Sequence, residues 1–144
     1  MDNKLNIIDL ISENHIKLRR LAEDRWTKTG EEEISHTEGF LLAKINMGKI
    51  SISEAARQAN ISRQAMFKCA KKLELRGYLK FNTDDKNNKY ACLTDKGSNY
   101  CIKSEHIKRT IEDEISNKIG KENLDILKEI LNQNLIWWVC EKTL

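Results

Sequence analysis

The chain has 144 residues, which suits one compact domain, and the 40% of them that are hydrophobic exclude a chain that is disordered throughout. The 33% of charged residues and the absence of proline favour long helices with solvated faces, and no apolar run is long enough to cross a membrane. The net charge of +3 is concentrated in residues 51–97, which hold ten Lys/Arg and five Asp/Glu, and such a basic zone suits a phosphate-binding surface.

The start of the chain is charged and amphipathic, unlike a secretory signal, so we expect a cytoplasmic protein without membrane contact.

The first 48 residues predict two helices. Residues 4–28 carry apolar side chains at three- and four-residue steps and predict one long helix. Residues 35–38 pair a serine with a glutamate three residues later, as in a capping box, and predict a second helix over 36–47 that Gly48 ends.

The next stretch predicts two short helices joined by a tight turn. Residues 50–52 are expected to be extended, and a third helix over 53–59 is capped by its first residue, a serine. Asn60 lies at the turn, where asparagine tolerates the left-handed backbone conformation. A fourth helix over 62–76 also begins at a serine cap, and Gly77 ends it.

These two helices match the requirements of a helix-turn-helix, which needs small or apolar residues where its helices touch. An ordinary helical hairpin is the alternative. The inward positions are Ala55, Ala56, Ala59, Ile61, Met66, Cys69 and Leu73. The residues that this arrangement leaves at the N-terminus and outer face of the fourth helix are Ser62, Arg63, Gln64, Phe67, Lys68 and Lys71. Such side chains suit base edges and phosphates, so we predict that they contact DNA. Phe67 either contacts thymine methyl groups or sugars, or packs under the hairpin that follows.

A β-hairpin follows the fourth helix. Residues 78–81 and 90–93 predict its strands, and the polar residues 82–89 predict its loop. Lys86 and Lys89 are expected to reach phosphates or the minor groove, and a solvated loop without a partner is the alternative.

Two more helices are predicted over 95–118, capped by Thr94, and over 121–142. Residues 135–139 are apolar on all sides, and such a patch is a liability on a monomer. It therefore favours a dimer, and burial within one chain is the alternative.

The order of elements and several motifs resemble the multiple antibiotic resistance regulator (MarR) family. The matching segments are Ser53–Ala56, Ser62–Met66, Leu73–Leu79 and Leu93–Gly97, the last being similar to the family's Leu-Thr-x-x-Gly. The wing departs from the family pattern, because Asp85-Lys86-Asn87 stands where the family usually has Asp-Arg-Arg. Lysine keeps the charge but lacks the planar fork of arginine.

The resemblance implies a fold that is mainly α with a small β-hairpin wing. A winged helix-turn-helix lobe at 35–97 would lie within a single domain, 1–144, between dimerisation helices in 1–30 and 98–144. The resemblance also implies a small aromatic effector bound between the lobe and the dimerisation helices, although the residues placed to line that cleft also suit an ordinary core: His15, Trp26, Phe40 and Trp137. The better candidates for a redox-active thiol are Cys101 and Cys140.

The function predicted is that of a sequence-specific regulator of transcription that binds double-stranded DNA. It would act as a homodimeric repressor on a near-palindromic operator and be released by a small ligand. A winged-helix adaptor between proteins, without DNA binding, is the alternative. The sequence has no glycine-rich phosphate loop, nucleophile elbow or zincin motif, so we expect no enzyme, no cofactor and no metal site. Cys101, Glu105 and His106 are close in sequence but lack a metal-binding spacing.

Overall fold

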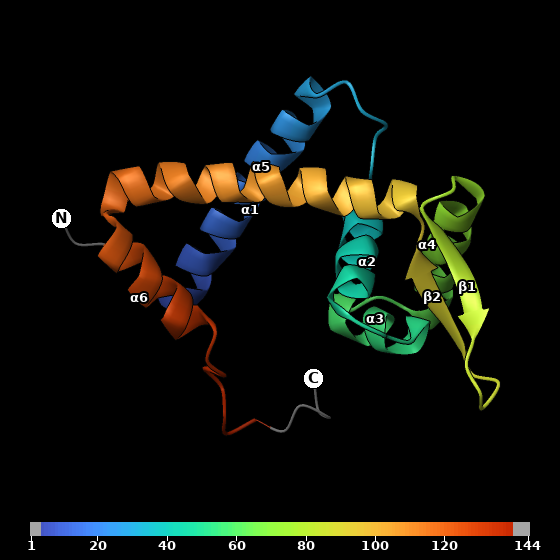
Figure 1. Cartoon of the computed structure of the whole chain (residues 1–144). Coiled ribbons are helices and arrows are strands. Elements are labelled where there is room, and N and C mark those ends of the chain that lie inside the picture. Colours follow the sequence, from blue (N-terminus) through green and yellow to red (C-terminus); the bar gives the residue numbers. More distant parts are fainter. Residues whose placement is uncertain (1–3, 140–144) are drawn as a thin grey trace. The chain divides into compact units, whose positions relative to one another are not determined.

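The computed structural model describes residues 4–139 (Figure 1). In chain order its elements are α1 (Ile7–Lys28), α2 (His36–Met47), α3 (Ile52–Ala59), α4 (Arg63–Leu75), β1 (Leu79–Thr83), β2 (Lys89–Leu93), α5 (Asp95–Ile119) and α6 (Lys121–Leu131). The predicted class, mainly α with one β-hairpin, is confirmed. The chain divides into two compact units, and the boundary between Ile107 and Lys108 lies inside α5. No helix among residues 4–139 is both long and apolar enough to span a membrane.

Serine and threonine caps set most of the helix starts. Ser35 and Glu38 form the predicted capping box at α2, and Ser62 accepts a hydrogen bond from the backbone N–H of Ala65 at α4. Ser51 is extended as predicted, but the extended conformation predicted for Ile52 and the cap at Ser53 are wrong. Ser51 caps α3 instead, because its hydroxyl accepts a 3.0 Å hydrogen bond from the N–H of Glu54 and places Ile52 inside the helix.

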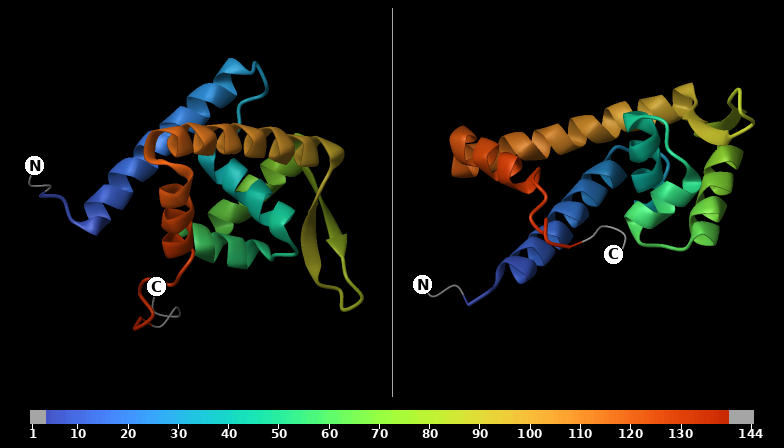
Figure 2. Two further views of the ribbon diagram at one scale, coloured as in Figure 1. Left: turned by 60° about the vertical axis from the view of Figure 1, so that its left-hand side comes forward. Right: turned by 90° about the horizontal axis from the view of Figure 1, so that it is seen from below.

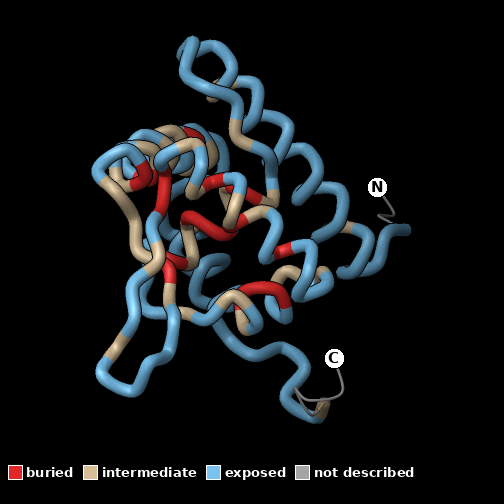
Figure 3. Tube along the Cα trace, turned by 90° about the vertical axis from the view of Figure 1, so that its right-hand side faces the viewer, coloured by how far each residue is buried: buried red, intermediate tan, exposed pale blue. Residues whose placement is uncertain are grey.

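The core lies between α2, α3, α4 and the hairpin (Figure 3). Its fully buried large side chains are Leu41, Leu42, Met66, Leu73 and Leu79. Cys101 extends this core from the first turns of α5, and its thiol donates to the carbonyl oxygen of Leu42 at 3.6 Å. The elements that carry the predicted DNA contacts are therefore held by one apolar cluster.

The hairpin is antiparallel, with Leu79 paired with Leu93 and Phe81 paired with Ala91. It lies beside α4 and extends past it (Figures 1 and 2). At its base, Gly97 in the first turn of α5 faces the carbonyl of Tyr78. A Cβ at this position would lie 2.0 Å from that oxygen, so the contact requires glycine. This glycine ends the Leu-Thr-x-x-Gly-like segment.

Two helices have no buried residue although they carry many apolar side chains: α1 and α6. The exposed apolar residues of α1 and the segment before it are Leu5, Ile7, Ile8, Ile11, Ile16, Leu18 and Leu21, and those of α6 are Ile126, Leu127, Ile130 and Leu131.

The predicted last helix, 121–142, is wrong in its second half. The helix ends at Leu131, and the chain continues to residue 139 in turns. The side chain of Asn134 accepts a 3.1 Å hydrogen bond from the N–H of Ile136, and this local bond competes with the helical one. Positions 140–142 of the predicted helix lie outside the described residues.

Candidate nucleic-acid interface

The turn between α3 and α4 adopts the geometry expected of a helix-turn-helix. Asn60 has φ 54° and ψ 45°, which confirms the left-handed conformation. Its N–H and that of Ile61 donate to the carbonyl oxygens of Arg57 and Ala56 at 3.2 and 3.1 Å. Ala55 and Ala56 are 0% and 2% exposed, so small side chains allow α3 to approach the next helix closely.

The inner face of α4 is set by Met66, Ala70 and Leu73, all fully buried. Ala70 was not among the residues predicted to face inward, although it falls four residues after Met66 and therefore on the same side of a helix. Cys69, predicted inward, is half-buried. Burial raises the pKa of its thiol to about 11, so it is protonated at neutral pH.

The outer face of α4 begins with exposed polar residues. Ser62, Arg63, Gln64 and Lys68 are exposed, as the sequence predicts, and Arg63 and Gln64 line an open hollow of about 480 Å³ together with Phe67. Within residues 4–139, the side chains of Arg63 and Lys68 make no ion pair. Both cations are thus available to an anionic partner.

Phe67 and Lys71 belong to a row of aromatic and cationic side chains between α4 and the hairpin. The ammonium of Lys71 lies 5.5 Å from the ring of Phe67 and 5.1 Å from that of Phe81. The ammonium of Lys89 also lies close to the ring of Phe81, at 4.7 Å. Phe67 is 44% exposed, whereas Lys71 is half-buried and also pairs with Glu74 at 3.3 Å. Lys71 therefore connects the helix to the wing as well as facing outward.

The C-terminal end of α4 is fixed by contacts between Arg76 and residues 38 and 43 positions earlier in the chain. Nη1 of Arg76 donates to Oε2 of Glu38 at 2.7 Å, and Nη2 donates to the carbonyl oxygen of Glu33 at 2.7 Å. Glu38 is 4% exposed. Burial alone would raise its pKa, but hydrogen bonds from Ser35 and the charge of Arg76 lower the pKa overall.

The same cluster continues to the base of the hairpin and to α5. The hydroxyl of Tyr78 donates to Glu32 at 2.7 Å, and the ammonium of Lys96 donates to Glu32 at 3.1 Å. Burial and the bond to Glu32 raise the pKa of Tyr78 to about 12, while the same bond lowers the pKa of Glu32. These contacts span 46 and 64 residues of sequence, so no local pattern could have indicated them.

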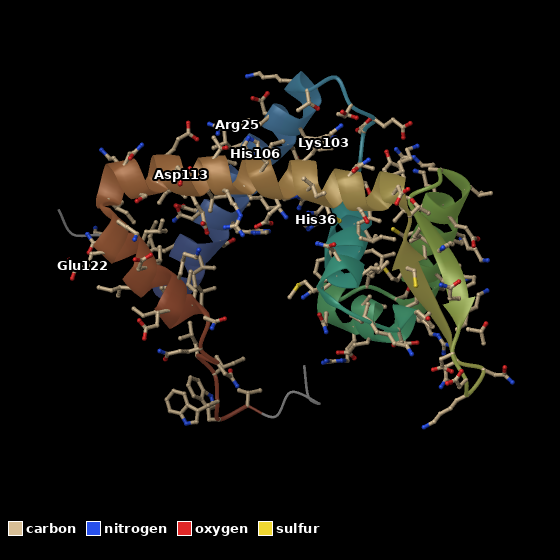
Figure 4. The ribbon with its side chains drawn as sticks, viewed as in Figure 1. Arg25, His36, Lys103, His106, Asp113 and Glu122 are labelled. Atoms are coloured by element: carbon tan, nitrogen blue, oxygen red, sulfur yellow. The ribbon has the colours of Figure 1, made fainter. Side chains whose placement is uncertain are left out.

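Lys103 adds a second contact from α5 to the loop after α1 (Figure 4), because its ammonium pairs with Glu31. Trp26, at the end of α1, donates from its indole N–H to the carbonyl oxygen of Glu32 at 2.9 Å and contacts the ring of Tyr100 at 4.9 Å. The loop is thereby held between α1 and the start of α5.

The four residues predicted to line an effector cleft have different surroundings. The His15 and His36 rings lie 6.4 Å apart, and Trp26 packs on Tyr100. Phe40 packs against the core, and Trp137 is 76% exposed beside Trp138. A shared cleft therefore stays a prediction. Of the thiol candidates, Cys101 is buried and Cys140 lies outside the described residues. Residues 4–139 contain no group of three His, Cys, Asp or Glu placed to hold a metal ion.

Solved structures with this architecture are numerous. The MarR family protein Rv2887 of Mycobacterium tuberculosis, in complex with p-aminosalicylic acid, is 20% identical and superposes with a TM-score of 0.70 over 88% of this chain and 96% of that one. The same protein in complex with DNA gives a TM-score of 0.69 at 20% identity, covering 89% and 96% of the two chains.

A third structure is MepR, a transcription regulator of the Staphylococcus aureus multidrug efflux pump MepA. It is 14% identical, with a TM-score of 0.68 over 88% of this chain and 94% of that one. No family model and no curated protein matches the sequence. At such low identity the likeness establishes the fold, and the chain thus has the winged helix-turn-helix architecture with flanking helices that is found in MarR family proteins.

Proposed function

We propose that this chain is a sequence-specific regulator of transcription that binds double-stranded DNA. The observation that carries the proposal is the asymmetry of α4: its inner face is fully buried, while Arg63, Gln64 and Lys68 on its outer face are exposed at the N-terminal half. The N-terminal part of a recognition helix is the part that enters the major groove, where these side chain types bond base edges and phosphates.

We also propose that it binds as a homodimer. The exposed apolar side chains of α1 and α6 have the composition of a core that a second copy would complete. A two-fold dimer would present two copies of α4 to half-sites separated by about one turn of DNA, ~34 Å. The corresponding operator is near-palindromic. Binding to DNA would take place in the cytoplasm.

The solved neighbours support a repressor that a ligand releases. Rv2887 has been crystallised with DNA and with salicylic acid, and MepR regulates an efflux pump. A small aromatic acid is accordingly the class of effector we propose for this chain. His15, Trp26, Phe40 and Trp137 remain the residues proposed to contact it, and a ligand that favours one dimer geometry would change the spacing of the two α4 helices.

The test begins by selecting bound duplexes from random DNA with the purified chain. Affinity for the selected duplex is then measured by fluorescence anisotropy at salt concentrations from about 50 to about 300 mM. In this range the release of counterions from DNA causes a measurable fall in affinity. We expect a steep loss of affinity with salt, about 0.9 logarithmic units per phosphate neutralised for each tenfold rise in salt concentration. The selected sequences should be near-palindromic.

The key variant is Arg63→Ala with Lys68→Ala. We expect it to lose specific binding by roughly 100-fold or more, because each lost base contact costs about 1–3 kcal/mol, with an unchanged oligomeric state. Lys108→Ala with Lys118→Ala removes the same charge from exposed positions of α5 and should bind almost as the parent does. Equal binding by the two double variants would refute the role of α4. Failure to select any duplex would favour the adaptor.

A further inference from the structure

The loop at the tip of the hairpin is organised by one carboxylate, that of Asp84. Its Oδ1 accepts hydrogen bonds from the backbone N–H groups of Lys86 and Asn88, both at 2.9 Å. The backbone N–H of Asp84 donates to the carbonyl oxygen of Asn88 at 3.0 Å, and Asn87 adopts a left-handed φ of 62°. Because these bonds close the loop on one residue, the position of Asp84 determines where the exposed Lys86 lies.

The other oxygen of Asp84 accepts a 3.4 Å hydrogen bond from the side-chain amide of Asn88 and also contacts a distant part of the chain. Its Oδ2 pairs at 3.3 Å with the ammonium of Lys49, which lies 35 residues earlier in the connection between α2 and α3. The same ammonium lies 4.3 Å from the ring centre of Tyr90 on β2. Lys49 therefore contacts both the hairpin loop and one of its strands from the body of the lobe.

The charge state needed for this contact is present at neutral pH. The hydrogen bond from Asn88 to the carboxylate, together with that from Lys86, keeps the pKa of Asp84 below its usual range despite some burial. The Asp84 side chain is 23% exposed and that of Lys49 is 57% exposed, so the ion pair is partly screened.

We propose that Lys49 is a positioning residue for the wing: through Asp84 and Tyr90 it holds the hairpin loop at a fixed place relative to α4, so that Lys86 and the recognition helix meet DNA together. This inference rests on the proposed function. It assigns Lys49 and Asp84 to holding the wing rather than to direct contact with the nucleic acid.

Coulombic repulsion and positioning make opposite predictions for Asp84. A carboxylate on a DNA-binding hairpin repels phosphates, so its neutralisation should strengthen binding if charge alone mattered. If Asp84 holds the loop, its neutralisation should weaken binding. Asp85 provides the matched control, because it is the neighbouring residue in the same loop, is exposed, and takes the same substitution.

The experiment compares Asp84→Asn, Asp85→Asn, Lys49→Met, Lys49→Arg and the Asp84→Asn/Lys49→Met double variant. Asparagine retains an oxygen that accepts the two backbone bonds within the loop, so the substitution removes the link to Lys49 and the 3.4 Å bond from the Asn88 side chain. We expect Asp84→Asn and Lys49→Met each to weaken binding to the selected duplex by roughly threefold to fivefold, as for an exposed ion pair. The double variant should be no weaker than either single variant. Lys49→Arg should restore binding, and Asp85→Asn should not weaken it.

Two further measurements separate the possible roles. The dependence of affinity on salt should be unchanged in Lys49→Met, because no phosphate contact is lost. Backbone ¹⁵N relaxation in the free protein should show increased motion of residues 86–88 in Asp84→Asn and Lys49→Met, but not in Asp85→Asn. Tighter binding by Asp84→Asn, with a reduced salt dependence in Lys49→Met, would overturn the proposal and make Lys49 a phosphate contact.

The relaxation measurement also separates this inference from the proposed function. If the parent chain binds no duplex DNA, the proposed function fails. Unchanged motion of residues 86–88 in both variants would refute the role of Lys49 even if the parent binds DNA well. Increased motion of residues 86–88 in variants that bind DNA with normal affinity would also refute it. The position of the wing would then have no effect on binding.

Discussion

The winged helix-turn-helix lobe and the helices α1 and α6 use apolar side chains in opposite ways. In the lobe, Leu41, Leu42, Met66, Leu73 and Leu79 are fully buried by elements of the same unit. In α1 and α6 no residue is buried, and leucine and isoleucine side chains are exposed along both helices. The lobe therefore buries its apolar side chains within one chain, whereas those of α1 and α6 are exposed, as the proposed dimer requires.

The largest expected effect tests this difference on the side of α6. Leu127→Asp with Leu131→Asp places charge on two side chains that are 44% and 52% exposed. A leucine buried at an interface contributes about 1.5–3 kcal/mol, so we expect the dimer to dissociate at micromolar concentration. Sedimentation velocity checks this.

The matched change on the same helix is Glu122→Lys, at an exposed polar position (Figure 4). It alters charge without touching the apolar residues and should leave the oligomeric state unchanged. A dimer that persists in the leucine double variant would show that α6 is not the interface.

The second effect concerns the lobe. Leu73→Ala removes a fully buried side chain, and we expect it to lower the free energy of unfolding by about 2–5 kcal/mol. Leu75, two residues later on the same helix, is 89% exposed, and its replacement by alanine should change stability by less than about 0.5 kcal/mol. Urea titration followed by circular dichroism gives both values. The loss in Leu73→Ala should not depend on protein concentration, unlike a loss at a dimer interface.

The smallest effect is the pH dependence contributed by Glu38. Because its pKa is lowered in the folded state, the carboxylate stabilises the fold above its ordinary pKa of 4.5, and this contribution is lost as the pH falls further. Glu38→Gln should therefore cost about 1 kcal/mol at pH 7 and progressively less below pH 4.5. The difference in stability between the parent and Glu38→Gln is measured by thermal unfolding from about pH 3 to about pH 7, where carboxylates titrate. Glu13→Gln, at an exposed position of α1, is the control.

Local signals were sufficient for most of the lobe. The capping box at Ser35, the left-handed Asn60 and the cap at Ser62 depend on residues three or four positions apart, and all three are confirmed. The cap of α3 was misplaced because two serines, Ser51 and Ser53, precede the same helix and only the fold decides between them.

Contacts between distant segments could not be predicted in this way. Arg76 with Glu38 and Lys49 with Asp84 are separated by 38 and 35 residues, and no pattern around either residue of a pair indicates its partner. The last helix was overextended because apolar periodicity continues past Leu131, whereas the polar stretch 132–134 allows the chain to leave the helix. The residues predicted to contact DNA or an effector remain predictions.

The contact of Gly97 with the carbonyl of Tyr78 has a mechanical consequence. Thr94 adds a 2.5 Å hydrogen bond from its hydroxyl to the carbonyl oxygen of Gly77, so a close backbone contact and a short side-chain bond together join the opening turn of α5 to the root of the hairpin. These contacts restrict movement between the first turn of α5 and the hairpin. We expect a change in the direction of residues 95–107 to move the hairpin with it.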